Sequence, residues 1–269
     1  MKTPNDYNYL ETGDKANPPI LFLHGFMGSA LDWIDIMTAL SDDFYCVAVD
    51  LPGHGQTKVA DDQSFTMEFC ARNLEKLSVG LGIAGAGVVG YSMGGRLAFY
   101  LAVNHAESFG PMVIESASPG LRTARERNDR RKHDETLARQ LMESPLINFI
   151  EKWYAQPLFA AIDKTTTAYQ QMLARRLLNE PRGLVKSLSL MGTGAQPPLW
   201  DKLARIQNDI LLIVGRQDTK FSQIAAEVAA QCPAAGVASV EKAGHTAHFE
   251  NMRAFLALVR RFFENIKRG

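Results

Sequence analysis

A serine, an aspartate and a histidine occur in this chain in an order and in settings that suit nucleophilic or proton-transfer chemistry. Ser92 lies within Gly90-Tyr-Ser-Met-Gly94, between an apolar run and a helix-like segment. A serine at such a sharp strand-to-helix turn is exposed above the edge of a sheet. A hydroxyl is a weak nucleophile or base until an imidazole removes its proton, and a buried carboxylate orients that imidazole. Ser92 is therefore predicted to be the reactive group.

Asp218 and His245 are the predicted partners of this serine. Asp218 follows the apolar run Ile210 to Val214, in a loop that can present a carboxylate to a histidine. A helix N-cap aspartate is the structural alternative, and Glu115, at the end of another apolar run, is the alternative acid. His245 follows a further apolar run, whereas His248 falls near the first turn of the last helix and is interpreted as structural.

Negative charge that develops during such a reaction requires preorganised hydrogen-bond donors. The segment His24 to Gly28 can supply the backbone N–H of Phe26, and Met93, the residue after the serine, can supply a second. These two groups are the predicted oxyanion hole. Asp50 and His54, in Asp-Leu-Pro-Gly-His-Gly, are interpreted as parts of a structural turn.

Strands and helices must position these residues, and the apolar pattern predicts both. Short apolar runs alternate with amphipathic stretches, which predicts a mostly parallel sheet flanked by helices. Together with the turn at Ser92, this pattern is typical of the α/β-hydrolase fold. The predicted strands are 20–23, 45–49, 87–90, 112–114, 210–214 and 237–240, and the predicted helices are 33–40, 67–81, 96–103, 221–230 and 254–266.

The alternation of strand and helix breaks between about Ser118 and Gln207. The pattern there is helical throughout, and prolines punctuate it. We interpret this segment as a helical cap inserted into the core, so that residues 1–117 and 208–269 form the α/β-hydrolase core and 118–207 the cap. A cap over the carboxyl ends of the strands would enclose the site and help to select the substrate.

Length and composition agree with one large globular domain and exclude several classes of function. The chain has 269 residues, of which 46% are hydrophobic. Its 29 basic and 29 acidic residues balance, which argues against a nucleic-acid or membrane-surface protein. No metal-ligand cluster, dinucleotide fingerprint or phosphate loop occurs, so no cofactor is expected.

The longest apolar runs are far shorter than the roughly 20 residues that a membrane span needs. The N-terminus lacks the apolar region of a signal peptide. The expected location is therefore the cytoplasm, and the three scattered cysteines are expected to be reduced thiols of the core.

Positive charge concentrates near the serine and at the start of the cap. Residues 122–132 contain six basic side chains and two acidic ones. A solvated helix face is the structural alternative for this run. Arg96, however, lies four residues after Ser92 on the same helix face, which would place its guanidinium beside the site. Because arginine binds carboxylates through two parallel hydrogen bonds, a small polyanion is favoured as substrate over a neutral ester.

Five segments of core and cap form a recognisable pattern. They are Gly-Tyr-Ser-Met-Gly-Gly-Arg (90–96), Glu-Ser-Ala-Ser-Pro-Gly-Leu (115–121), Arg130 with His133-Asp134, Lys-Trp-Tyr-Ala-Gln-Pro-Leu-Phe (152–159) and Gly-Thr-Gly-Ala-Gln-Pro-Pro-Leu-Trp (192–200). With them the chain resembles, from about Ile20 to Glu250, the 2-succinyl-6-hydroxy-2,4-cyclohexadiene-1-carboxylate synthases of menaquinone and phylloquinone biosynthesis. The resemblance implies a lyase that eliminates pyruvate from 2-succinyl-5-enolpyruvyl-6-hydroxy-3-cyclohexene-1-carboxylate, without hydrolysis and without an acyl-enzyme.

The resemblance also implies roles for individual residues. It places the triad at Ser92, Asp218 and His245 and the oxyanion donors at Phe26 and Met93. These are the same residues that the strand and turn pattern predicts. It further implies substrate-binding residues, with three arginines for the substrate carboxylates and two aromatic side chains that line the pocket. These are Arg96, Arg130, Arg176, Tyr91 and Trp153.

The positions of the cap residues leave alternatives open. Arg131 stands beside Arg130 and Arg175 beside Arg176, so either neighbour could be the binding residue. Trp153 could instead belong to the apolar core of the cap. The remaining arginines of the charged run are not part of the family pattern and are expected to face water; they are Arg122, Arg125 and Arg127.

Two other functions use the same residue types. A true serine hydrolase would act on a carbon–carbon bond of a keto acid or on an ester with the same triad. A small-ligand receptor on this fold would bind without turnover. In every case the expected partner is a small molecule, a polycarboxylate in the first interpretation, with no nucleic acid and no membrane.

Overall fold

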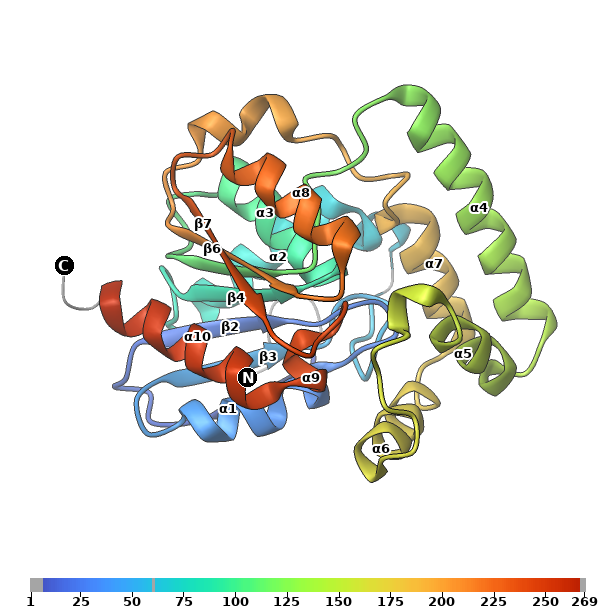
Figure 1. Cartoon of the computed structure of the whole chain (residues 1–269), viewed down its shortest axis with the longest axis horizontal. Coiled ribbons are helices and arrows are strands. Elements are labelled where there is room, and N and C mark those ends of the chain that lie inside the picture. The colour runs from blue at the N-terminus through green and yellow to red at the C-terminus, as the bar shows by residue number, and fades with distance from the viewer. Residues whose placement is uncertain (1–6, 60, 267–269) are drawn as a thin grey trace.

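Seven strands form one sheet in the order β1-β3-β2-β4-β5-β6-β7 in the computed structural model, which describes residues 7–59 and 61–266 (Figure 1). All neighbouring strands are parallel except β1, which is antiparallel to β3. The strands are β1 (Tyr9–Thr12), β2 (Pro19–Leu23), β3 (Tyr45–Val49), β4 (Gly87–Tyr91), β5 (Met112–Glu115), β6 (Ile210–Gly215) and β7 (Ala235–Val240).

The six predicted strands are confirmed, each within two residues of its expected limits. The sequence missed β1, a four-residue edge strand that is only partly buried and so lacks an apolar run. The segment Met1 to Asp6, on which the expectation of no signal peptide rests, lies outside the described residues, as do the two ends of the predicted core.

Helices cover both faces of the sheet, as expected. α1 (Ile34–Leu40) and α10 (Met252–Ile266) pack on one face, around an apolar cluster that includes Trp33 and Phe255. The other face is covered by α2 (Met67–Gly80), α3 (Met93–Asn104) and α8 (Thr219–Ala229). The predicted helix 33–40 is divided into η1 (Ala30–Trp33) and α1, and α3 begins three residues before its predicted start, directly after Ser92.

Four helices lie between β5 and β6, and Figure 1 shows them together at one end of the sheet. An apolar cluster that includes Phe149, Tyr154 and Met172 holds them together. Trp200 and Leu203, by contrast, pack with the core cluster around α2 and α3. The helices are α4 (Ala124–Glu143), α5 (Leu146–Tyr154), α6 (Thr167–Arg176) and α7 (Pro181–Met191), with the short turns η3 (Pro157–Phe159) and η4 (Trp200–Arg205).

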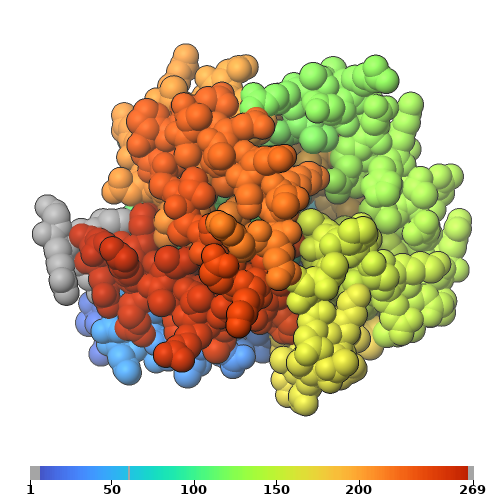
Figure 2. Space-filling view, in the orientation of Figure 1, coloured from blue at the N-terminus to red at the C-terminus, as the bar shows by residue number. Residues whose placement is uncertain are grey.

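Local sequence signals set the limits of these helices. Thr123 and Glu126 form a capping box in which each side chain accepts from the other residue's backbone N–H, and α4 starts there. Pro145 follows the end of α4 and precedes α5, and Pro181 occupies the first turn of α7, where no N–H is needed. In the space-filling view the cap and α8 adjoin along a seam (Figure 2).

The structure also bears on the expected state of the cysteines and on the question of a membrane span. Cys46, Cys70 and Cys232 are all buried free thiols, as predicted. Among residues 7–59 and 61–266 there is no helix with the length and apolar character needed to cross a membrane.

Candidate active site

Ser92 occupies the tight turn between β4 and α3. Its φ of 49° and ψ of −103° form a strained backbone conformation for a residue with a side chain. Gly90 and Gly94 permit the turn, because a Cβ on them would lie 2.5 Å from the Gly94 oxygen and 2.2 Å from the Leu23 oxygen, respectively. The Ser92 N–H donates to the Glu115 carbonyl at 2.9 Å. The serine is thereby fixed at the carboxyl end of the central strands.

The structure brings Ser92, His245 and Asp218 together. The Nε2 atom of His245 lies 3.3 Å from Ser92 Oγ, and its Nδ1 atom lies 2.8 Å from Asp218 Oδ2. Asp218 also serves as the N-cap of α8, because its Oδ1 atom accepts from the Phe221 N–H at 3.1 Å. The two roles considered for Asp218 from the sequence therefore coexist in one carboxylate.

Glu115 and His248 form a second buried acid–histidine pair. The Glu115 carboxylate accepts from the His248 backbone N–H at 3.0 Å and lies 2.8 Å from its Nδ1 atom. Glu115 is therefore not the partner of His245, and His248 is structural, as interpreted from the sequence. The ring of Tyr91 packs between the two histidines, with centroid distances of 5.6 Å to His245 and 4.7 Å to His248.

The loop that carries His245 is held by Glu250. The Glu250 carboxylate accepts from the Gly244 N–H at 2.6 Å, the Thr246 N–H at 2.9 Å and the Thr246 hydroxyl at 2.6 Å. These bonds flank the histidine on both sides and fix its backbone. No sequence signal marks Glu250 for this role, because an acid five residues after a histidine forms no recognisable motif.

The segment 24–28 forms the second side of the site. The Gly28 N–H donates to the Gly25 carbonyl at 2.9 Å, and the Gly94 N–H of α3 donates to the His24 carbonyl at 3.1 Å. The Phe26 and Met93 residues both line the cavity next to Ser92. The Met93 N–H lies at the start of α3, where backbone N–H groups have no intrahelical acceptor and negative charge is favoured.

A cavity of about 900 Å³ lies between core and cap. This volume is in the range of sites for small-molecule ligands. The ring of Trp153 is half-buried and packs against Phe26 with a centroid distance of 5.2 Å. Core and cap both line the cavity, with Ser92, His245, Phe26 and Arg96 from the core and Arg130 and Trp153 from the cap.

Arg96 brings a positive charge to this cavity. Its Nη1 atom donates to the Met191 carbonyl at 2.8 Å and to Gln196 Oε1 at 3.1 Å. None of the ion pairs in the described part of the chain includes Arg96. Burial, and secondarily the charge of Arg130, lower the pKa of Arg96 to about 10, so it remains protonated at neutral pH.

Arg130 is the second guanidinium at the cavity. Its Nε atom lies 2.7 Å from Asp134 Oδ1, and the Asp134 side chain is buried. Arg131 instead donates to the Gly194 carbonyl at 2.9 Å, and the residues that line the cavity do not include it. Of the two neighbours considered from the sequence, Arg130 faces the cavity.

Arg176 is paired within the protein in this structure. Its Nη1 atom pairs with Asp32 of η1 at 2.8 Å, and its Nε atom donates to the Tyr154 hydroxyl at 3.0 Å. Arg175 also contacts Asp32, at 3.3 Å, and neither arginine lines the cavity. Burial would raise the pKa of Asp32, but the charge of Arg176 overcomes it and holds that pKa at about 2.

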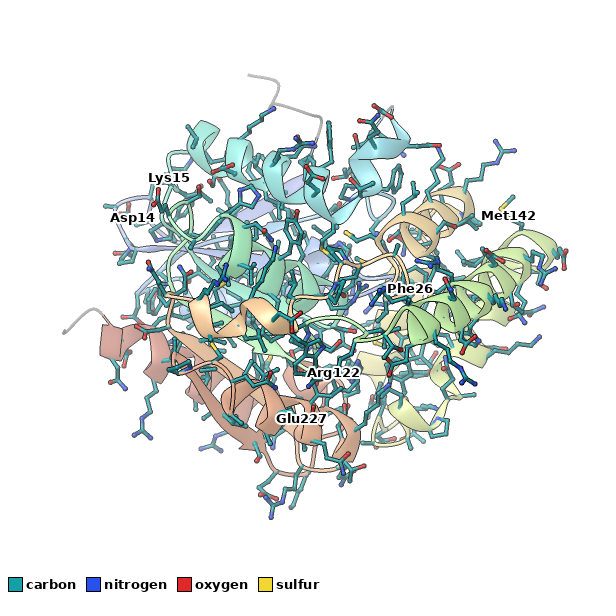
Figure 3. All side chains as sticks on the ribbon, turned by 90° about the horizontal axis from the view of Figure 1, so that it is seen from above. Asp14, Lys15, Phe26, Arg122, Met142 and Glu227 are labelled. Carbon is teal, nitrogen blue, oxygen red and sulfur yellow. The ribbon has the colours of Figure 1, made fainter. Side chains whose placement is uncertain are left out.

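Tyr91 and Arg122 lie in different parts of the site. The Tyr91 ring contacts both histidines, and Tyr91 is not among the residues that line the cavity. Arg122 is exposed, as expected, with 45% of its side chain accessible, and it also lies at the edge of the cavity. Its guanidinium lies 3.5 Å from the ring centre of Trp200 and 2.7 Å from Glu227 (Figure 3). Arg125 does face water, with 93% of its side chain exposed.

Arg127 makes two backbone contacts, to the carbonyls of Leu121 and Arg122 at 3.0 and 2.9 Å. Asp50 is structural, as interpreted from the sequence, because its carboxylate accepts from the Ala30 N–H at 2.7 Å and the Gln56 N–H at 2.8 Å. His54 lies in the same turn, where its Nδ1 atom lies 3.1 Å from the Pro52 carbonyl.

Comparisons with known proteins extend over both core and cap. The family model of the alpha/beta hydrolase fold matches residues 18–252. The chain is 32% identical to the 2-succinyl-6-hydroxy-2,4-cyclohexadiene-1-carboxylate synthase of Pectobacterium atrosepticum, over 92% of this chain and 94% of that protein. It is 33% identical to Protein PHYLLO, chloroplastic, of Arabidopsis thaliana over 95% of this chain, which spans 16% of that protein's length. The solved structure of MenH from S. aureus superposes with a TM-score of 0.90 at 28% identity, covering 97% of this chain and 99% of that one.

Proposed function

The chain belongs to the 2-succinyl-6-hydroxy-2,4-cyclohexadiene-1-carboxylate synthase family on the α/β-hydrolase fold, and from this premise we propose how its residues perform the reaction. The enzyme eliminates pyruvate from 2-succinyl-5-enolpyruvyl-6-hydroxy-3-cyclohexene-1-carboxylate. Its base is the Ser92 alkoxide, which forms when His245 takes the hydroxyl proton. Asp218 holds His245 in the tautomer that can accept that proton.

The elimination balances without a cofactor. The Ser92 oxygen removes the ring proton at C2, next to the succinyl ketone, and the electron pair left behind forms the C2–C3 double bond. The existing C3–C4 double bond shifts to C4–C5, and the bond from C5 to the enolpyruvyl oxygen breaks. The enolpyruvate that leaves takes up a proton and becomes pyruvate. Charge that spreads onto the succinyl ketone is stabilised by the N–H groups of Phe26 and Met93, because donors fixed in advance stabilise the transition state without reorganisation.

One observation carries the choice of substrate. Three guanidinium groups, of Arg96, Arg122 and Arg130, line the same cavity as the Ser92–His245 pair, and that of Arg122 is paired with Glu227. Arg96 has no carboxylate partner within the described residues, so a substrate carboxylate can complete its charge. A tricarboxylate fits this site better than a neutral ester does.

The remaining substrate contacts come from the cap, which we place at residues 118–207. Trp153 presents an aromatic face beside Phe26. We assign the main carboxylate contacts to Arg96 and Arg130. The resemblance assigns a third to Arg176, and that contact would require Arg176 to leave Asp32.

Pyruvate release from the enolpyruvyl substrate tests the assignment. Asp218→Asn keeps a residue that can cap α8 but reverses the hydrogen bond to His245, so the turnover rate should fall by about 10³- to 10⁴-fold. Asp61→Asn is the matched control, because the Asp61 side chain also caps a helix, the short η2 (Asp62–Phe65), and lies in a different turn. Equal rates for the two variants would refute the assignment.

A serine hydrolase on the same triad would behave differently. It would accumulate an acyl group on Ser92 during turnover and would cleave simple esters faster than it releases pyruvate. The elimination predicts an unchanged protein mass throughout turnover, which mass spectrometry of the quenched reaction measures. A small-ligand receptor would show no turnover with either substrate.

A further inference from the structure

We propose that Asn179 of the cap is a positioning residue that orients the oxyanion donor Phe26 through a chain of two backbone peptide planes. The proposal rests on the proposed role of the Phe26 N–H, and it adds a group that touches neither substrate nor triad. Asn179 lies between α6 and α7 and is buried. No sequence motif marks it.

The amide of Asn179 joins the cap to two core loops. Its Nδ2 atom donates to the Met27 carbonyl at 2.8 Å and to the Arg176 carbonyl at 3.1 Å. Its Oδ1 atom accepts from the Gly55 N–H at 3.0 Å. A buried amide whose donor and acceptor are both used by backbone groups has one orientation, so it holds the Met27 carbonyl in a fixed direction.

This carbonyl leads to the oxyanion donor in two steps. The Met27 C=O shares a peptide plane with the Gly28 N–H, which donates to the Gly25 carbonyl at 2.9 Å. The Gly25 C=O in turn shares a plane with the Phe26 N–H. The described peptide bonds are all trans. Because a peptide unit is close to planar, the direction of each carbonyl fixes the N–H on the other side of its plane. Asn179 therefore acts on Phe26 without contacting it.

Met27 needs this support because its backbone is strained. Its φ is 63°, in the left-handed region that a residue with a side chain seldom adopts. Such a conformation persists only where neighbouring contacts determine it. The Met27 side chain is fully buried in the apolar cluster of the cap, although the residue belongs to a core loop. Both its side chain and its carbonyl are thus held by the cap.

The core holds the other end of the same turn. His24 accepts from the Leu51 N–H at Nε2 with a distance of 2.9 Å, which leaves the proton on Nδ1 to donate to the Gly25 carbonyl at 2.7 Å. Burial lowers the pKa of His24, which keeps it in this neutral form. The Gly25 carbonyl therefore has a support from the core, and the Met27 carbonyl has one from the cap. The segment 24–28 is therefore held from both sides, by the core and by the cap.

Kinetics can separate this role from a general effect on folding. Asn179→Leu removes both hydrogen-bonding functions, and Asn179→Asp keeps the acceptor for Gly55 but places a carboxylate oxygen against the Met27 carbonyl. Loss of a whole oxyanion donor slows turnover by about 10²- to 10³-fold, so misorientation of one should lower kcat by about 10- to 100-fold. KM should change less than about twofold, because a donor used in the transition state contributes little to ground-state binding.

Asn208→Asp is the matched control. Asn208 also donates from Nδ2 to backbone carbonyls, those of Ala106, Phe109 and Gly110, but it does so just before β6, at the opposite end of the strand from Asp218. The Asn208→Asp substitution should lower the free energy of unfolding without lowering kcat. If Asn179→Leu does not fold, the test can be made with Asn179→Asp alone, because its bond to the Gly55 N–H remains.

A second measurement does not depend on the lyase reaction. An organophosphate that labels Ser92 uses the same oxyanion donors, so Asn179→Asp should slow the labelling by a similar factor even if pyruvate release were not the natural reaction. An unchanged kcat and labelling rate would overturn the proposal, as would a raised KM with kcat retained. If Asn208→Asp lowered kcat by the same factor, the effect of Asn179 would be a structural one.

Discussion

Arg96 is one of the two arginines that we propose bind the substrate carboxylates. Arg96 follows Ser92 by one helical turn, and two of its hydrogen bonds go to uncharged acceptors. A guanidinium held in this way is oriented but not neutralised. Its strongest available partner is a carboxylate of the substrate, because charge-assisted bonds contribute more than neutral ones.

Replacement of Arg96 should therefore weaken substrate binding strongly. Loss of a hydrogen bond to a charged group costs about 1.5 to 3 kcal/mol, so Arg96→Ala should lower kcat/KM for pyruvate release by about 10- to 150-fold. Arg96→Lys should recover only part of this loss, because lysine lacks the planar pair of donors. Arg125→Ala is the control, since 93% of the Arg125 side chain is exposed. Equal small effects at both positions would contradict the role of Arg96.

The grouping of Ser92, Asp218 and His245 could be predicted from the sequence, and the surroundings of the cap residues less completely. Ser92 has the two glycines of its turn as a local signal, and Asp218 and His245 each follow an apolar run. Arg176 has no comparable signal. Its pairing with Asp32 joins residues 144 positions apart, and such a contact becomes visible only in the folded chain.

At the scale of elements, the loop between β7 and α9 (Ala247–Glu250) depends on one carboxylate. Glu250 accepts three hydrogen bonds from the residues on either side of His245. The imidazole must reach Ser92 and Asp218 at once. Small displacements of this loop should therefore affect the rate more than the binding of substrate.

Glu250→Gln should lower kcat about tenfold or more, because an amide cannot accept all three bonds and its NH₂ group would oppose a backbone N–H. KM should change little. Glu241→Gln in the preceding turn is the control, since the Glu241 side chain is 74% exposed. Steady-state kinetics of pyruvate release measure both variants, and unchanged kcat in Glu250→Gln would show that the loop is held by other contacts.

The elements themselves follow from apolar periodicity, except at the edges. Five of the six predicted strands, β2 to β6, carry apolar runs that neighbouring strands and helices bury almost completely. The sixth, β7, lies at the edge of the sheet and only its Val240 is buried. β1 is paired on one side only and partly exposed, so its four residues show no such run. The start of α3 was predicted late, because Met93, Gly94 and Gly95 read as part of the turn although their backbone is already helical.

At the scale of the whole molecule, four ion pairs among the described residues join the cap to the core: those of Arg175 and Arg176 with Asp32, Lys186 with Asp62, and Arg122 with Glu227. The pairs of Arg176 and Lys186 differ most in burial. Arg176 and Asp32 are buried, with 7% and 8% of their side chains exposed. Lys186 and Asp62 are exposed, at 45% and 67%. A buried carboxylate left without its partner, or a buried guanidinium left without its carboxylate, is far more costly than a surface charge without a partner.

The buried pair should make stability depend on pH in the acid range. The pKa of Asp32 is about 2 in the folded protein, against an ordinary value of 3.8. Because the folded value is the lower one, the contribution to stability is fully present above about pH 4 and is lost as the pH falls toward 2. By the relation of about 1.4 kcal/mol per pKa unit it amounts to about 2 kcal/mol.

Asp32→Asn should remove this pH-dependent part and lower the free energy of unfolding at pH 7 by about 3 to 5 kcal/mol, because Arg176 would be buried without a carboxylate. Asp62→Asn should cost less than about 1 kcal/mol. Urea unfolding at pH 7, 4 and 3 measures both variants. Parallel pH profiles for Asp32→Asn and the unsubstituted protein would contradict the contribution of this pair.

The proposed role of Ser92 as the base that starts the elimination can be tested by one direct measurement. Pyruvate release from saturating 2-succinyl-5-enolpyruvyl-6-hydroxy-3-cyclohexene-1-carboxylate is followed for the unsubstituted enzyme and for Ser92→Ala, with the fold of both checked by circular dichroism. We expect the variant to bind the substrate but to release pyruvate at least about 10³-fold more slowly. A Ser92→Ala enzyme that turns over at the full rate would contradict this role.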